Sequence, residues 1–154
     1  MKIRIMTLDD YDDVYALWDS LPGVGLHPEG EDSREGMAYY LRRNPETCFV
    51  AETTPACGHP STEGNCRIIG AVLCGNDGRR GYINHLAVAN EHWGKGIGRA
   101  LVNACLAAMQ KEGIAMCSFV VFKDNEAGNA FWDALGSIRR NDCLYRNLET
   151  GKEA

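Results

Sequence analysis

The sequence predicts one domain of mixed α and β structure over residues 1–154, with a central, mostly antiparallel sheet of six to seven strands flanked by four helices. Its length of 154 residues is sufficient to bury one hydrophobic core. Apolar runs typical of strands and segments of helical periodicity follow one another along the chain, separated by turns rich in Pro, Gly and Asn. No internal repeat and no second domain boundary interrupts this order.

The first part of the chain predicts a strand followed by two helices. Residues 2–6 alternate polar and apolar side chains, as a half-buried strand does. Thr7 and Asp10 have the spacing of a capping box, which begins a helix with one apolar face. Ser33 is placed to cap a second helix, which ends before Pro45.

The middle of the chain predicts three more strands, at residues 48–51, 68–74 and 82–88. The first two should pair as a hairpin, with residues 53–65 as a long inserted loop. Asp77 and Gly78 form a strong turn signal before the third strand.

The last part of the chain predicts two helices and three strands. A helix continues to about residue 112 and ends at Gly113. Residues 118–122 are apolar throughout, which predicts a strand covered on both faces. Residues 125–135 predict a fourth helix, and residues 137–148 predict a terminal hairpin.

The overall charge argues against whole classes of partner. The formal net charge is −5 and the pI is about 5.3, whereas nucleic-acid and anionic-membrane proteins are basic. No apolar run reaches the length of a membrane span, and the first residues lack the apolar core of a signal peptide. We therefore expect no nucleic-acid or membrane partner, and a cytoplasmic protein.

Seven cysteines form an odd set, and most of them lie in apolar segments. They are expected to be reduced, buried thiols. Cys57, His59 and Cys66 are close in sequence, but their spacing matches no zinc pattern. No metal site is expected.

The most informative stretch is a glycine-rich turn between a predicted strand and a predicted helix. Its glycines allow a ligand to approach the backbone closely, and the unpaired N–H groups of a helix start attract anions. A triphosphate-binding loop would need Gly-Lys-Ser or Gly-Lys-Thr, which is absent here. A dinucleotide fingerprint has another glycine spacing and lies at the first strand. The turn comprises Trp93, Gly94, Lys95, Gly96, Ile97 and Gly98.

This turn resembles the pyrophosphate-binding motif of the GNAT superfamily of N-acetyltransferases, in which Gln or Arg is followed by two residues, Gly, one residue, and Gly or Ala. Trp93 departs from the first position, but the backbone N–H groups that hold the pyrophosphate remain. The resemblance implies acetyl-CoA as cosubstrate, bound by Leu86, Ala87, Val88, Trp93, Gly94, Lys95, Gly96, Ile97, Gly98, Arg99 and Ala100.

A second stretch, residues 125–136, resembles the fourth-helix motif of the same superfamily, and the order of the predicted elements also matches. The resemblance implies that Asn125, Gly128, Phe131 and Trp132 contact CoA. Many members have Tyr where this chain has Trp132, and that hydroxyl protonates the leaving thiolate. Because indole is no acid, either Tyr145 or a water replaces it, or CoA leaves as the thiolate.

The reaction also needs a hydrogen-bond donor for the oxyanion and an acceptor for the amine proton. The resemblance implies the backbone N–H of Val88 as the donor. His85, Glu52 and Tyr82 are the candidate proton acceptors. His85 alternates with its neighbours along a strand, so its side chain faces either the cleft or a helix layer.

We expect an N-acetyltransferase that acts on a primary amine of a small molecule or peptide by direct attack in a ternary complex, as a monomer or homodimer. Nine acidic residues in the first 35 favour a cationic acceptor, although charged helix faces are usually only solvated. The alternative is a noncatalytic acyl-CoA sensor or regulatory module, favoured by Trp93 and Trp132. The acidic residues are Asp9, Asp10, Asp12, Asp13, Asp19, Glu29, Glu31, Asp32 and Glu35.

Overall fold

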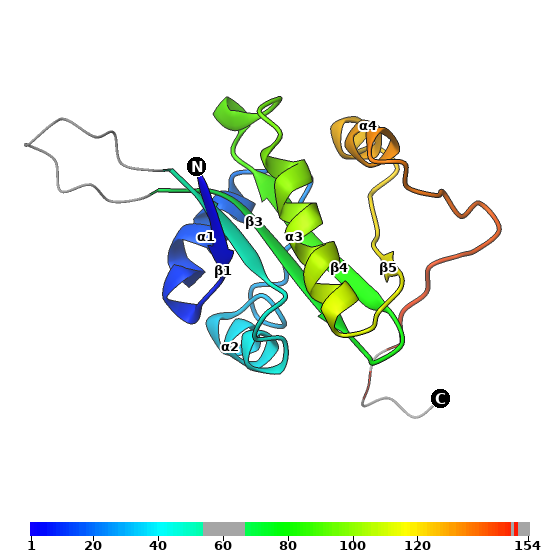
Figure 1. Ribbon diagram of the computed structural model, residues 1–154, viewed down its shortest axis with the longest axis horizontal. Helices are drawn as coiled ribbons and strands as arrows, with labels where there is room; N and C mark the ends of the chain where they lie inside the picture. The colour runs from blue at the N-terminus through cyan, green and yellow to red at the C-terminus, as the bar shows by residue number, and fades with distance from the viewer. Residues whose placement is uncertain (54–66, 149, 151–154) are drawn as a thin grey trace, which may run out of the picture. The chain divides into compact units, whose positions relative to one another are not determined.

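The computed structural model describes residues 1–53, 67–148 and 150 (Figure 1). Most of the loop predicted over residues 53–65, with its Cys57, His59 and Cys66 cluster, lies outside the described residues. By their contacts, the residues form two compact units, Met1–Phe122 and Lys123–Ala154.

The first unit contains a five-stranded sheet in the order β1-β2-β3-β4-β5. The first four strands pair as antiparallel neighbours, and β5 pairs with β4 in parallel. The strands are β1 (Lys2–Ile5), β2 (Phe49–Glu52), β3 (Ile68–Asn76), β4 (Gly81–Val88) and β5 (Cys117–Ser118).

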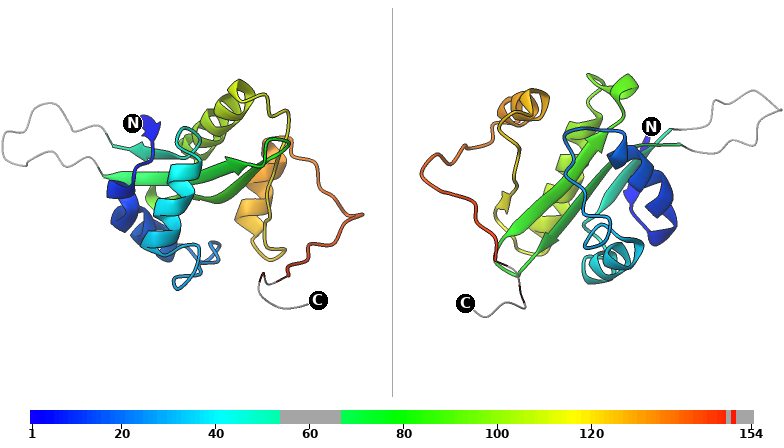
Figure 2. Two further views of the ribbon diagram at one scale, coloured as in Figure 1. Left: turned by 90° about the horizontal axis from the view of Figure 1, so that it is seen from below. Right: turned by 180° about the vertical axis from the view of Figure 1, so that it is seen from behind.

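Helices cover both faces of this sheet. Figures 1 and 2 show α1 (Tyr11–Asp19) and α2 (Arg34–Arg43) on one face and α3 (Ile97–Lys111) on the other. Trp18 and Met37 are almost completely buried on the first face, and Leu101 and Met109 on α3 are equally buried. With apolar layers on both sides, β3 is buried along nearly its whole length.

The predicted starts of the first two helices are confirmed. Asp10 accepts a hydrogen bond from the backbone N–H of Thr7 at 2.8 Å, as in a capping box. A 3₁₀ turn, η1 (Leu8–Asp10), precedes α1. The Ser33 hydroxyl accepts from the backbone N–H of Gly36 and caps α2.

The two predicted hairpins are also confirmed. Thr53 donates its backbone N–H to the carbonyl of Arg67 at 2.9 Å, which joins β2 to β3. Asp77 accepts two backbone hydrogen bonds within the β3–β4 turn, and Gly78 adopts a φ of +84° there. A φ of this sign favours glycine.

The fifth predicted strand is much shorter than expected. Residues 118–122 were predicted to be a strand covered on both faces, but β5 contains only Cys117 and Ser118. Val120 and Phe122 each keep more than half of their surface exposed. The physical reason is that β5 pairs with β4 at only two positions, and a strand without a paired neighbour is not maintained by its apolar residues alone.

The second unit contains α4 (Glu126–Ala134) and the C-terminal segment. Asn125 caps α4, and Gly136 ends it at a φ of +81°, as predicted. The hairpin predicted over 137–148 is wrong, because none of these described residues forms a strand. Its apolar side chains remain exposed, so no buried face stabilises a pairing register. The described sheet therefore has five strands and not six to seven.

Buried thiols occur only in part as predicted, because Cys117 is half-buried and Cys143 is exposed. Cys48, Cys74 and Cys105 are free and buried. Burial raises the pKa of Cys48 to about 12, so this thiol is neutral at physiological pH. In the described part of the chain, no helix is long and apolar enough to cross a membrane.

Candidate active site

The centre of the candidate site is an irregularity in β4. Ala71 of β3 pairs with Ala87, but Leu73 pairs with Asn84, so β4 contains one extra residue between these pairs. His85 lies in this bulge with a φ of +49°, which is unusual for a residue other than glycine. Bulges of this kind turn a side chain away from the regular alternation of a strand.

The His85 side chain points toward the helix layer that contains α1. Its Nε2 atom lies 2.7 Å from Oδ1 of Asp32, in the segment between α1 and α2. The imidazole also meets the Trp18 ring edge to face at 5.0 Å. Trp18 donates its indole N–H to the carbonyl oxygen of His85 at 3.0 Å. Of the two orientations that the sequence left open, the structure therefore adopts the one toward the helices.

Asp32 is a residue that sequence reasoning did not single out. Only 2% of its surface is exposed. Its Oδ2 atom accepts from the backbone N–H of His27 at 2.8 Å, and the Tyr11 hydroxyl donates to its backbone carbonyl at 2.9 Å. In the sequence, Asp32 is one of nine acidic residues in this region. Nothing near it distinguishes it from the others, because its partner His85 on β4 is far away along the chain.

The end of β4 presents backbone groups on the side away from β3. Ala89 donates its N–H to Ile69 of β3 at 2.9 Å. Because successive residues of a strand direct their N–H groups to opposite sides, the N–H of Val88 points away from β3. The carbonyl of Val88 lies on the same side and accepts from the indole N–H of Trp93 at 2.6 Å.

β5 diverges from β4 before this point. The pairing between these strands covers Gly81 with Cys117 and Tyr82 with Ser118. Tyr82, a candidate proton acceptor, is therefore at the paired end of β4, and Val88 is at the other end. After Ser118 the chain makes no further ladder pairs with β4.

The glycine-rich turn has the geometry that close approach of an anion requires. It follows a 3₁₀ turn, η2 (Asn90–His92), and leads directly into α3. Gly94 and Gly96 have φ values of +73° and +78°, and a Cβ atom on either would meet no protein atom within 4 Å. The backbone is thus open on this side of both glycines. The ammonium group of Lys95 donates a hydrogen bond to the backbone carbonyl of Glu91 at 2.9 Å.

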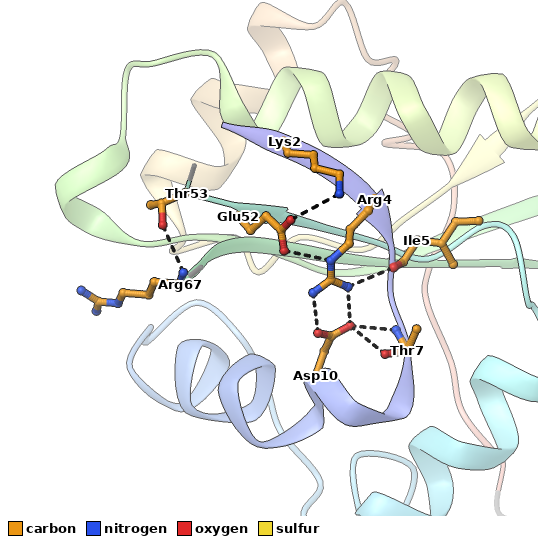
Figure 3. Close-up of polar contacts among 8 residues, drawn as sticks. All are labelled: Lys2, Arg4, Ile5, Thr7, Asp10, Glu52, Thr53 and Arg67. Atoms are coloured by element: carbon orange, nitrogen blue, oxygen red, sulfur yellow. Dashed lines mark hydrogen bonds and ion pairs between the residues drawn. The ribbon is translucent and has the colours of Figure 1, made fainter. Parts of the chain in front are cut away.

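Glu52, another candidate proton acceptor, is held in an ion-pair network (Figure 3). Arg4 donates from Nε to Oε2 of Glu52 at 2.8 Å and from Nη2 to Asp10 at 2.7 Å. Lys2 approaches the other oxygen of Glu52 at 3.8 Å. Burial by itself would raise the pKa of Asp10, but hydrogen bonds from Arg4 and Thr7 outweigh burial and lower it. The network joins β1, β2 and η1.

The second unit contains the remaining predicted residues. Asn125 accepts from the backbone N–H of Gly128 at 2.8 Å, and a Cβ atom on Gly128 would lie within 3 Å of the Asn125 side chain. Gly128 therefore makes room for the cap. Phe131 and Trp132 meet edge to face at 5.1 Å, and Trp132 is buried. Tyr145 is 68% exposed.

The chain is similar to known acetyltransferases. The model of the family described as "Acetyltransferase (GNAT) family" matches residues 11–136. N-alpha-acetyltransferase 30 of Schizosaccharomyces pombe is 35% identical to the chain over 121 residues, which cover 75% of this chain and 73% of the relative.

Solved structures show the same fold. The structure of the NatC complex bound to Gag peptide and CoA matches with a TM-score of 0.68 and 24% identity, covering 91% of this chain and 87% of that chain. PaiA N-acetyltransferase from Thermoplasma acidophilum, in complex with coenzyme A, matches with a TM-score of 0.67 and 18% identity, covering 87% of each chain. The predicted mixed α and β fold is confirmed.

Proposed function

Since the chain belongs to the acetyltransferase (GNAT) family and transfers an acetyl group from acetyl-CoA to an amine, we propose that its acceptor is the α-amino group of a peptide. The relative that is 35% identical is an N-alpha-acetyltransferase. An α-ammonium group has a pKa of about 7.7 to 8.0, against about 10.4 for lysine. A much larger fraction of an α-amine is therefore neutral at physiological pH, and a weak base is sufficient to deprotonate the rest.

The glycine-rich turn is the proposed site for the pyrophosphate of CoA. The support is the positive φ of Gly94 and Gly96 and the open space beside both residues. The first N–H groups of α3, from Ile97 to Arg99, point out of the helix start and favour a negative charge. Leu86, Ala87 and Val88 of β4, which the resemblance also implies, belong to this proposed site.

His85 is the proposed general base, acting from the helix side of the sheet, where 19% of its side chain is exposed. The backbone N–H of Val88 is the proposed oxyanion donor. The amine nitrogen attacks the thioester carbon, so that a C–N bond forms while the C–S bond breaks. The proton of the attacking amine passes to His85, and the electron pair of the broken bond leaves on sulfur. The observation that carries this proposal is the hydrogen bond of His85 to a buried carboxylate, in a bulge three residues before Val88.

Glu52 has a structural role in this proposal. Its carboxylate is bonded to Arg4 and is 8% exposed, so it is poorly placed to exchange protons with a substrate. Tyr82 stays an alternative acceptor at the paired end of β4. Sulfur leaves as the thiolate, which the ordinary thiol pKa of about 8.5 permits, or takes a proton from Tyr145 or water.

The cationic character of the acceptor rests on the α-ammonium group and on the exposed acids near α1. Asp10 and Asp32 are buried and hydrogen-bonded, so neither contributes a charge to the surface. Asp13 borders an open cavity of about 370 Å³ beside α1, where Glu91 is paired with Arg67 at 3.6 Å. This is the place where a positively charged peptide would be attracted. We propose a monomer or homodimer as the active form.

The test is a calorimetric titration with acetyl-CoA, followed by thiol release with peptides that differ in their free α-amine. Peptides with a free N-terminus should be acetylated, and the same peptides with a blocked N-terminus and an internal lysine should not. His85→Gln should bind acetyl-CoA normally and lose about 100-fold or more in kcat. Binding without release from any amine would instead support the acyl-CoA sensor.

A further inference from the structure

We infer that Asp32 is a positioning residue that fixes the tautomer of His85, so that Nδ1 is the atom that receives the proton of the acceptor amine. This inference rests on the proposed role of His85 as general base. Asp32 lies 53 positions from His85 in the sequence and does not itself contact the reacting atoms. Its action is through the 2.7 Å hydrogen bond to Nε2.

The position of Asp32 is determined from three sides. One oxygen of the carboxylate accepts from the backbone N–H of His27, and the other faces His85. The backbone carbonyl of Asp32 accepts from the hydroxyl of Tyr11, which belongs to α1. The next residue, Ser33, caps α2. A side chain that is 2% exposed and bonded in this way has little freedom to move.

The carboxylate decides which nitrogen of His85 bears the hydrogen. A carboxylate only accepts hydrogen bonds, so the hydrogen between the two groups belongs to Nε2. In a neutral imidazole the other nitrogen, Nδ1, then carries the lone pair. Among the described residues, Nδ1 has no hydrogen-bond partner, and 19% of the side chain is exposed. Nδ1 is thus the atom available to a proton.

The same contacts predict an unusual effect of Asp32→Asn. The N–H of His27 can only donate, so it requires the single oxygen of the new amide. The amide NH₂ group then faces Nε2 of His85 and donates to it. This reverses the tautomer, because Nε2 becomes the acceptor and Nδ1 must carry the hydrogen. The base is then blocked although its position and size are unchanged.

Asp32→Ala acts differently. It removes both hydrogen bonds but imposes no tautomer, since the methyl group neither donates nor accepts. A purely structural role predicts that Asp32→Ala is the more damaging change, because it leaves a cavity and an unpaired N–H. A tautomer-fixing role predicts the opposite order of activity. The two variants therefore separate the two explanations.

The experiment measures kcat, KM and the tautomer of His85 in the wild type, Asp32→Asn and Asp32→Ala. Imidazole ¹⁵N chemical shifts report the tautomer, with His85→Gln to assign the signal. We expect Nε2–H in the wild type, Nδ1–H in Asp32→Asn, and a loss in kcat of about 100-fold or more with a nearly unchanged KM for acetyl-CoA. Asp32→Ala should retain more activity than Asp32→Asn.

Asp10→Asn is the matched control. It removes the same charge from another buried acid on the same face of the sheet, but Asp10 is bonded to Arg4 and not to His85. Its Tm should fall while kcat and the tautomer of His85 stay as in the wild type.

Three outcomes would overturn the inference. They are an Nδ1–H tautomer in the wild type, a kcat within about threefold of the wild type in Asp32→Asn, and a lower activity in Asp32→Ala than in Asp32→Asn. A wild type that binds acetyl-CoA but acetylates no amine would overturn the proposed function instead. The NMR signals would in that case still decide whether Asp32 orients the imidazole.

Discussion

Trp93 donates its indole N–H to the carbonyl oxygen of Val88 at 2.6 Å and thereby ties the glycine-rich turn to the last residue of β4. The GNAT motif has Gln or Arg at the position of Trp93. Since the indole is 54% exposed, its contribution to core packing is limited. The hydrogen bond instead fixes the start of the turn beside the proposed oxyanion donor.

Trp93→Phe should therefore weaken acetyl-CoA binding while the fold remains stable. Loss of one hydrogen bond costs about 0.5 to 1.5 kcal/mol, which corresponds to a twofold to about tenfold increase in Kd. Calorimetric titration measures Kd, and thermal unfolding serves as the control for the fold. An unchanged Kd would show that this bond does not order the turn.

Gly96→Ala should abolish or strongly weaken CoA binding, and Gly113 offers a matched control. Both glycines have a φ of +78°, and a Cβ atom on either meets no protein atom within 4 Å. Strain from the left-handed conformation should therefore lower the free energy of unfolding of both variants by a similar amount, about 1 to 3 kcal/mol. Only Gly96 is at the proposed pyrophosphate site, at the start of α3, because Gly113 follows the end of that helix.

We expect Gly96→Ala and Gly113→Ala to lower Tm by similar amounts, and Kd for CoA to rise about tenfold or more in Gly96→Ala alone. Measurements of Tm and Kd on the same preparations provide this comparison. Equal affinities in the two variants would refute the pyrophosphate site.

Arg4→Leu should destabilise the protein and make it more sensitive to acid. The change leaves the buried carboxylates of Asp10 and Glu52 without their shared guanidinium partner. Loss of hydrogen bonds to charged groups should lower the free energy of unfolding at pH 7 by about 1.5 to 3 kcal/mol. The exposed Arg140 pairs with Asp142, and Arg140→Leu should leave that free energy unchanged.

The pH dependence follows from the lowered pKa of Asp10. Burial opposes ionisation, but Arg4 and Thr7 bring the folded-state pKa below the ordinary value of 3.8. The resulting stabilisation is fully present above about pH 4 and is lost as the pH falls through the folded-state pKa of Asp10. Without Arg4 only Thr7 offsets the burial of Asp10, so the acid loss should begin at a higher pH. Urea unfolding between pH 2 and 7 measures this change, and superimposable profiles would contradict it.

Local patterns predicted much of the fold. The capping residues Thr7 and Ser33, the turn at Gly78 and the helix end at Gly113 act within a few residues, so the sequence around each is sufficient to predict it. The length of the strand at residues 118–122 and the hairpin at residues 137–148 were predicted wrongly for the complementary reason. A strand needs a paired neighbour and a buried face, and an apolar pattern does not guarantee either.

In the candidate site, too, one part could be predicted from local sequence and another could not. The glycine-rich turn could be identified from consecutive residues, because its glycines and the following helix start form one continuous segment. The pairing of His85 with Asp32 could not, because it depends on a bulge in β4 and on a segment between α1 and α2, 53 positions away. Short-range interactions therefore specified the elements and the glycine-rich turn, and only packing of distant segments decided which carboxylate meets the imidazole.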